Sequence, residues 1–192
     1  MKSEYKNFAR NRDNIRLAFA NLMLKYNDIN KITIIEIVKE AKISRGTFYS
    51  HYKSIDDVVD DIGKEFARTL KTVLDKYNND NYLANSLPYF EELHNFFSEY
   101  QDLYSKLLNA GQGPLISEYV RTAVYNSLYE MPILRELYTD QEKFKFDTKF
   151  FAAGAVQVVF DNLKSNDYNL NRERIVNLIN NKFIEIFIES KK

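Results

Sequence analysis

Residues 33–53 read TIIEIVKEAKISRGTFYSHYK, and this stretch decides how the rest of the chain is interpreted. Thr33 and Glu36 have the spacing of a capping box, in which the two side chains satisfy backbone N–H groups at a helix start. Ser44 marks a second helix start only three residues after Ala41, the last apolar residue of the first stripe. The pattern predicts two short helices that cross at a tight turn, a helix-turn-helix arrangement over about residues 31–51.

The second short helix has one side that the chain is expected to bury and one that it is not. Phe48 and Tyr52, four residues apart, form the buried side. The other side carries Arg45, several hydroxyl groups and Gly46, a residue type that costs about 1 kcal/mol relative to alanine inside a helix. An ordinary amphipathic surface helix accounts for the two aromatic residues, but it leaves the glycine and the basic excess unexplained.

The net charge of zero hides a strong asymmetry along the chain. Residues 1–53 carry 11 Lys+Arg and 5 Asp+Glu, so their net charge is 11 − 5 = +6. Residues 54–192 carry 16 Lys+Arg and 22 Asp+Glu, so their net charge is 16 − 22 = −6. A basic N-terminal part joined to an acidic remainder indicates that the first part meets a polyanion.

The composition narrows the function classes further. There are no cysteines among the 192 residues and two histidines, His51 and His94, which lie 43 positions apart. Thiolate metal sites and a cysteine nucleophile are therefore excluded, and no catalytic constellation is present, so we expect neither an enzyme nor a metal or cofactor. The N-terminus is polar and no apolar run reaches the ~20 residues of a membrane span, so we expect a cytoplasmic protein with no membrane contact.

Helical periodicity dominates the remaining sequence, and no strand-like alternation persists. An apolar stripe from Ile15 to Tyr26 predicts the first helix, and a longer stripe predicts a helix over 54–77 that ends at the polar run 78–81. The last two helices are expected at about 144–164 and 171–189. The fold class predicted is all-α, with about nine helices.

The stretch from Thr33 to Lys53, with the following SIDDV, resembles the DNA-binding segment of the TetR family of transcriptional regulators. The resemblance covers about residues 8–68 and rests on the caps, the apolar spacing, the Gly-Thr-Phe-Tyr core and the lysine before the next helix. It implies an N-terminal three-helix DNA-binding domain over 8–68 and a C-terminal regulatory, ligand-binding and dimerisation domain over 69–192. Lys42 stands where the family usually has glycine, and a left-handed backbone there would cost a lysine on the order of 1 kcal/mol.

The resemblance also implies which residues contact double-stranded DNA. Arg45, Thr47 and His51 have the chemistry to recognise base edges, and Gly46 allows the backbone to approach closely. Tyr49, Lys53 and Thr33 resemble the phosphate-contacting positions, and Arg10 and Arg12, which we expect just before the first helix, would extend that contact. The DNA-contacting residues expected are Thr33, Ser44, Arg45, Gly46, Thr47, Tyr49, His51 and Lys53.

The C-terminal part is rich in tyrosine, since ten of the fourteen tyrosines follow residue 76. Stripes of Phe, Tyr and Leu most simply form a core, but aromatic walls with hydroxyl groups also suit a ligand pocket. The family resemblance favours a pocket for an unknown small-molecule effector. The candidate lining residues are Phe97, Tyr100, Tyr104 and Tyr125, whereas His94 is expected to be structural or exposed.

The last two helices indicate self-association. Small residues at 152–155 permit close helix approach, and apolar residues cover more than one face of the terminal helix. The family resemblance likewise implies a homodimer formed through these two helices, which would hold two recognition helices in neighbouring major grooves of a palindromic operator. The expected function is a ligand-responsive repressor that its effector releases from DNA. The alternative is a coregulator of the same fold whose helical body binds a protein partner.

Overall fold

The computed structural model describes residues 2–77, 85–110, 113–165 and 167–189. All regular structure within these ranges is helical, which confirms the all-α prediction. The polar run 78–81, expected to end the long helix, lies outside the described residues. Ten α-helices are described, against about nine expected, together with one short 3-10 helix.

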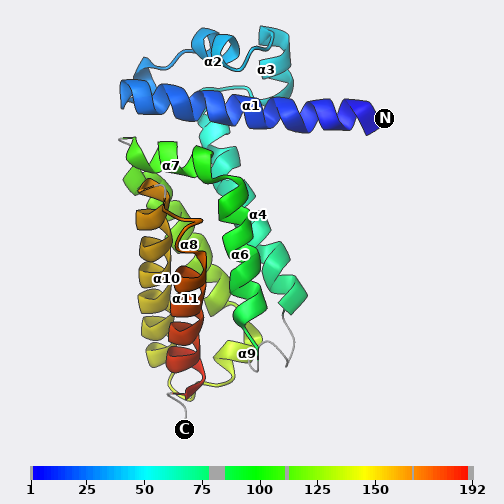
Figure 1. Ribbon diagram of the computed structural model, residues 1–192. Helices are drawn as coiled ribbons and strands as arrows, with labels where there is room; N and C mark the ends of the chain where they lie inside the picture. Colours follow the sequence, from blue (N-terminus) through cyan, green and yellow to red (C-terminus); the bar gives the residue numbers. More distant parts are fainter. Residues whose placement is uncertain (1, 78–84, 111–112, 166, 190–192) are drawn as a thin grey trace.

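The helices lie in two parts, which we call the head and the body (Figure 1). The head consists of α1 (Lys2–Tyr26), η1 (Ile29–Lys31), α2 (Ile34–Glu40) and α3 (Arg45–His51). The body consists of α6 (Leu87–Glu99), α7 (Gln101–Asn109), α8 (Gly113–Tyr129), α9 (Pro132–Arg135), α10 (Gln141–Lys164) and α11 (Arg172–Phe187). The long helix α4 (Ile55–Tyr77) runs from the head down the length of the body.

The first helix is longer at its N-terminus than its apolar stripe predicted. The stripe itself is confirmed, because Ile15, Leu22 and Met23 are buried. The expectation that Arg10 and Arg12 precede the helix is wrong, since α1 already begins at Lys2. Residues 2–12 contain neither glycine nor proline and several good helix formers, so helical propensity extends α1 beyond its buried stripe, past α3 in Figure 1.

Local capping makes α2 and α3 begin where the sequence predicts. The hydroxyl oxygen of Thr33 accepts the backbone N–H of Glu36 at 3.3 Å, and the Glu36 carboxylate accepts the backbone N–H of Thr33 at 3.1 Å. The predicted capping box is therefore confirmed. Ser44 caps α3 in the same way, since its hydroxyl oxygen accepts the backbone N–H of Thr47 at 3.0 Å.

The turn between α2 and α3 requires a left-handed residue, and that residue is Lys42 with φ 55. The backbone N–H of Ile43 donates to the carbonyl of Val38 at 3.0 Å, and that of Lys42 donates to the carbonyl of Lys39 at 3.3 Å. These two bonds are those of a Schellman motif, whose left-handed position is usually glycine. The strain anticipated for Lys42 is thus present in the turn.

Replacing Lys42 by glycine is expected to raise the free energy of unfolding by about 0.5–1 kcal/mol, because glycine adopts a positive φ without a Cβ clash. Chemical denaturation of Lys42→Gly measures the change. The matched variant Lys42→Ala removes the same charge but keeps the Cβ, so it should show no such gain. A Lys42→Gly protein less stable than Lys42→Ala would contradict this account of the turn.

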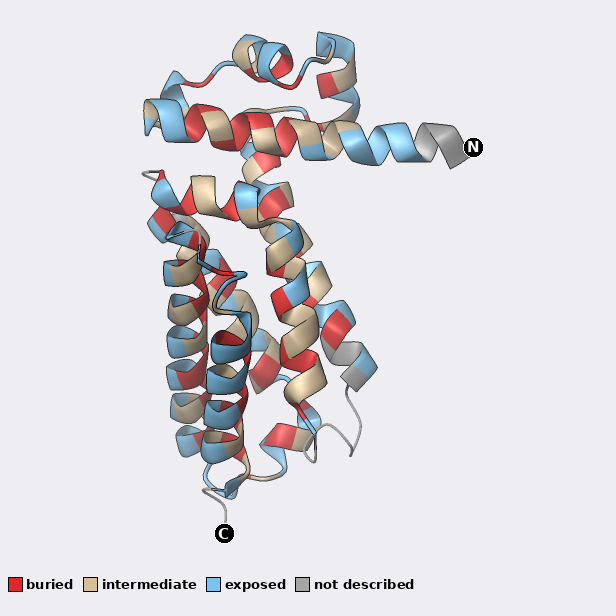
Figure 2. Ribbon diagram, in the orientation of Figure 1, coloured by how far each residue is buried: buried red, intermediate tan, exposed pale blue. Residues whose placement is uncertain are grey.

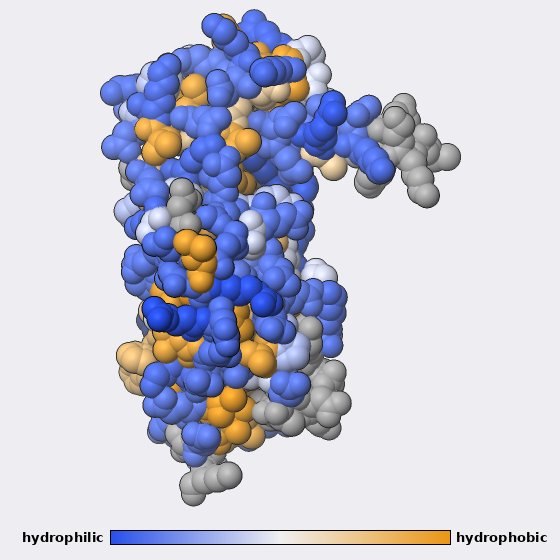
Figure 3. Space-filling view, in the orientation of Figure 1, coloured by the Kyte–Doolittle hydropathy of each residue, from blue (hydrophilic) through white to orange (hydrophobic). Residues whose placement is uncertain are grey.

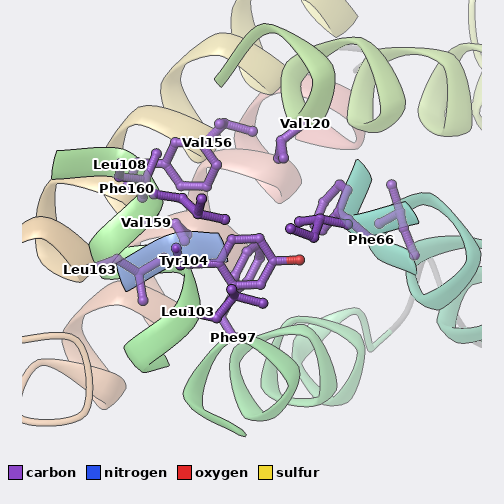
Figure 4. Close-up of a cluster of buried hydrophobic side chains, with 14 of the residues drawn as sticks. Phe66, Phe97, Leu103, Tyr104, Leu108, Val120, Val156, Val159, Phe160 and Leu163 are labelled. Carbon is purple, nitrogen blue, oxygen red and sulfur yellow. The ribbon is translucent and has the colours of Figure 1, made fainter. Parts of the chain in front are cut away.

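The body buries an aromatic and aliphatic core between its helices (Figures 2 and 4). Helix α10 packs against α7, α8 and α11, while α4 packs against α6 and α8. Figure 4 shows Phe66 of α4, Tyr104 of α7 and Phe160 of α10 converging on one cluster of buried side chains. The chain turns at Tyr100, so the candidate pocket residues Phe97 and Tyr104 lie on different helices, α6 and α7.

None of the helices in the described ranges combines the length and apolar character needed to cross a membrane.

Candidate functional site

The outward side of α3 is the first candidate site. Phe48 and Tyr52 are 0% and 5% exposed, as predicted, and α3 packs against α1 and α2. Arg45, Tyr49 and Lys53 are exposed, with Tyr49 at 53%. Two cationic side chains and one phenol therefore project from the same short segment that the buried pair anchors.

Three of the predicted DNA-contacting hydroxyl groups form hydrogen bonds within the chain, those of Thr33, Ser44 and Thr47. The Ser44 and Thr47 hydroxyls lie 2.9 Å apart, and the Thr33 hydroxyl donates to the Glu36 carboxylate at 2.8 Å. Their side chains therefore order the N-termini of α2 and α3. The helix ends that they cap still direct backbone N–H groups outward, and such groups favour an anionic partner.

Gly46 is not required by packing within the chain. A Cβ built at this position meets only the Ser44 hydroxyl, at 3.7 Å, which is ordinary contact distance. At Gly63, by contrast, a Cβ would lie 2.9 Å from the Tyr119 ring, so an internal neighbour explains that glycine. An exposed helical glycine without an internal reason is consistent with close approach by another molecule.

His51 occupies a more sheltered position than the other candidate residues. Its ring lies against Phe8 of α1, with ring centroids 3.9 Å apart, and its side chain is half-buried. Burial, and then the positive charge of Arg12, lower the pKa of His51, so the neutral ring is favoured at neutral pH. Phe8 is a contact that the sequence reasoning missed, because it lies beyond the apolar stripe of α1.

A charged network joins the head to α4. The guanidinium of Arg16, 2% exposed, donates to the Asp61 carboxylate at 2.6 and 2.9 Å and to Glu65 at 3.3 Å. The Tyr52 hydroxyl donates to the same Asp61 oxygen at 2.6 Å. Arg12, expected to contact phosphate, instead pairs with Glu65 at 3.2 Å.

The network changes the ionisation of its members. Burial alone would raise the pKa of Asp61, but the Tyr52 hydrogen bond and the charge of Arg16 outweigh it and lower that pKa. Burial alone would lower the pKa of Arg16, and Asp61 reverses this effect, so both side chains stay charged. Asp61 and Glu65 of α4 therefore neutralise Arg12 and Arg16 of α1, and no other basic side chain of the head that the structure describes pairs with these two acids.

The second candidate site is a cavity of about 60 Å³ in the body. Side chains of α4, α6, α8, α10 and α11 line it, among them Phe66, Leu70 and Phe97, and nearly all of them are apolar. Drug-sized ligands occupy roughly 300–1,000 Å³, so the cavity as it stands suits only a small molecule.

The four predicted pocket residues do not share this cavity. Phe97 lines it, whereas Tyr104 lines a second, smaller space of about 20 Å³ beside Phe19 and Gly63. Tyr100 borders an open surface hollow between α1 and α7, and Tyr125 stacks on Tyr129 with ring centroids 5.3 Å apart. Helical periodicity in the sequence identified which residues share an aromatic face, but it could not show which cavity each face lines.

His94 is a cavity residue that the sequence reasoning did not select. It is 3% exposed and stacks on Tyr168, with ring centroids 4.2 Å apart and planes 9° from parallel. Both rings line the cavity, and this contact agrees with a structural role for His94. Sequence spacing could have identified His94 as a buried residue. It lies four positions after Phe90 and three before Phe97, which places it on the same apolar side of one helix.

A third feature is an apolar surface on the last two long helices, which we call the α10–α11 face. Phe146 and Phe150 are 66% and 75% exposed, and Leu178 of α11 is 43% exposed. The face is defined by Phe146, Phe150, Ala153, Gly154 and Leu178. Figure 3 shows hydrophobic atoms at the surface of the body over α10 and α11.

The terminal helix is covered in part by its own chain. Ile175, Phe183 and Phe187 of α11 are at most 3% exposed, because α6 and α10 of the same chain pack over them. Of the other apolar residues of this helix, Ile179, Ile184 and Ile186 are half-buried and Leu178 is exposed, so the chain by itself covers the helix only in part. The exposed apolar side chains lie mainly on α10, where Gly154 also leaves open space, since a Cβ there would meet nothing within 4 Å.

No protein-family model matches the chain, and a comparison with curated protein sequences finds no relative.

Proposed function

We propose that the protein is a DNA-binding transcriptional regulator of the TetR type, a ligand-responsive repressor that binds a palindromic operator as a homodimer. The observation that carries the proposal is the outward surface of residues 45–53, where Arg45, Tyr49 and Lys53 are exposed around a glycine that no contact among the described residues explains. In this proposal residues 8–68 form the DNA-binding domain and residues 69–192 the regulatory domain.

The roles of the exposed side chains follow from their chemistry. Arg45, at the first position of α3, can donate two parallel hydrogen bonds to a guanine edge in the major groove. Tyr49 and Lys53 can donate to phosphate oxygens and so set the register of the helix. Arg10 is exposed on α1 and can add a phosphate contact, whereas Arg12 is held by Glu65.

His51 has a smaller role here than the sequence suggested. Its ring lies tilted against that of Phe8 and its neutral form is favoured, so it contributes little to binding a polyanion. We assign it instead to positioning the N-terminal turns of α1 beside α3.

The α10–α11 face supports the homodimer. A two-fold axis would bring the same face of a second chain against it, burying Phe146 and Phe150 and using the open space at Gly154 for close helix contact. The two α3 helices would then be held at a set spacing. A palindromic operator matches that symmetry.

Helix α4 supports a route from effector to DNA. Asp61 and Glu65 hold Arg16 of the head, and Phe66 and Leu70, within the next two turns, line the body cavity. A ligand that enlarges the cavity would move this segment of α4 relative to α1. Only a ligand that prefers one spacing of the heads over the other shifts the DNA-binding equilibrium.

The test is a fluorescence-anisotropy titration with a duplex carrying an inverted repeat, taken from beside the encoding gene or selected from a random library. Arg45→Ala is expected to weaken binding by roughly tenfold to a hundredfold, or 1–3 kcal/mol, and to relax the preference at one base pair. Lys53→Ala should weaken binding to all sequences alike and reduce the salt slope by about one.

The control is Arg174→Ala, which removes an exposed arginine from α11 in the body and should leave DNA affinity unchanged. Equal affinity and sequence preference in Arg45→Ala and Arg174→Ala would refute the assignment of α3. A wild-type protein that binds no duplex but copurifies with a protein partner would favour the coregulator alternative.

A further inference from the structure

His94 lines the body cavity and has one ring nitrogen whose chemistry restricts what can bind there. Nε2 of His94 lies 3.4 Å from the backbone carbonyl oxygen of Tyr168. The other ring nitrogen, Nδ1, is buried and has no hydrogen-bond partner among the described residues. A buried polar atom without a partner is uncommon and destabilising, so it indicates a site for a missing group.

The hydrogen bond to Tyr168 defines the tautomer of His94. A carbonyl oxygen only accepts, so Nε2 must carry the proton. Burial lowers the pKa of His94, which keeps the ring neutral and leaves Nδ1 as an unprotonated acceptor. A complementary ligand must therefore donate a hydrogen bond to this atom.

The rest of the lining sets the remaining character of the ligand. Apart from His94 and the two tyrosines Tyr89 and Tyr168, the described lining residues are aliphatic or phenylalanine, and none carries a carboxylate, an ammonium or a guanidinium. An ionised ligand would be desolvated here without an opposite charge, at a cost of several kcal/mol. Aromatic rings such as Phe97 and Phe160 offer flat apolar contacts.

We propose that the cavity binds an uncharged, mainly apolar compound with a single hydroxyl or N–H group, which donates a hydrogen bond to Nδ1 of His94. Phenolic compounds are the simplest members of this class. Binding a ring requires the cavity to grow beyond about 60 Å³, and the partly buried residues Leu93, Val124 and Ile179 are the lining side chains with room to yield. The effector role of the compound rests on the proposed function, whereas its binding does not.

The experiment compares phenol with toluene, which has nearly the same shape but a methyl group in place of the donor, and with benzoate, which carries a charge. Binding to the free protein is followed by ligand-observed NMR and calorimetry. Replacing His94 by phenylalanine keeps a ring to stack on Tyr168 but removes the acceptor. The ratio of phenol affinity to toluene affinity is expected to fall about tenfold in His94→Phe, and benzoate should bind neither protein.

A second measurement needs no variant. Only His51 and His94 are present, so ¹⁵N-histidine labelling gives two rings to assign. Phenol should shift the Nδ1 resonance of His94 toward the hydrogen-bonded range, toluene should not, and His51 serves as the internal reference. This readout stands if His94→Phe fails to fold.

The inference is overturned if phenol and toluene change in parallel in His94→Phe, if both shift Nδ1 of His94 alike, if benzoate binds more tightly, or if none of the three binds. DNA affinity is measured separately on the same samples. Phenol binding at His94 by a protein that binds no DNA would leave this inference intact and defeat the proposed function. DNA binding by a protein with no phenol site would defeat this inference and leave the proposed DNA-binding function intact.

Discussion

Replacing Asp61 by alanine is expected to lower the free energy of unfolding by about 3 kcal/mol or more, one of the two largest effects anticipated for this protein. The reason is that Arg16 is only 2% exposed and donates to Asp61 through two nitrogen atoms, at 2.9 and 2.6 Å. Without Asp61 the buried guanidinium keeps only the longer contact to Glu65, at 3.3 Å, and removing one partner of a buried pair typically costs 3–5 kcal/mol. The Tyr52 hydroxyl also loses its acceptor. Urea denaturation at neutral pH measures the loss.

The matched control for this prediction is the preceding residue. Asp60 pairs with Lys64 at 3.7 Å, but both side chains are more than half exposed. Asp60→Ala should therefore change stability by less than about 1 kcal/mol. Similar losses in the two variants would show that the Arg16 network contributes no more than a surface pair.

The same network predicts how the difference between wild type and Asp61→Ala depends on pH. The pKa of Asp61 is lowered in the folded protein, so its contribution is fully present above the unfolded pKa of about 4 and is lost as pH falls through the folded value. The stability gap between the two proteins should consequently narrow in acid and stay constant from about pH 5 to 8. A gap that widens below pH 4 would contradict the lowered pKa.

The second large effect concerns association. Phe150→Glu is expected to raise the dissociation constant of the homodimer at least about a hundredfold, because the two-fold axis would bury two carboxylates in an apolar contact. Phe150 is 75% exposed in the single chain, so the replacement should leave the fold of each chain intact. Sedimentation should show wild type at twice the 22.7 kDa chain mass and Phe150→Glu at the chain mass, both at micromolar concentration.

The control is Leu24→Glu, which places the same charge on an exposed apolar position of α1, 48% exposed and outside the α10–α11 face. This variant should remain dimeric. Gly154→Leu tests the close helix approach separately, because a Cβ added at this position meets nothing within 4 Å in the single chain, whereas the leucine side chain would occupy the expected contact. A wild-type chain that sediments at 22.7 kDa would defeat the dimer proposal, and loss of dimer in Leu24→Glu alone would place the contact elsewhere.

The sequence was sufficient for features that depend on local spacing. The capping box at Thr33 and Glu36, the N-cap at Ser44 and the left-handed strain at Lys42 all follow from interactions within about five residues, and the structure contains each of them. The buried pair Phe48 and Tyr52 follows from helical periodicity in the same way. The DNA-contacting roles assigned around that pair remain predictions.

Tertiary packing decided what local spacing could not. It pairs Arg12 and Arg16 with acids from α4, places Phe8 on His51 and distributes the four candidate pocket residues over separate places. It also brings His94 beside Tyr168, 74 positions away in sequence, and leaves one nitrogen of its ring without a hydrogen-bond partner in the described part of the chain. The physical reason is that helix caps and apolar stripes depend on residues close together in sequence. Cavities and buried ion pairs depend instead on which distant helices meet. An amphipathic stripe shows that one face of a helix is covered, but not which element covers it.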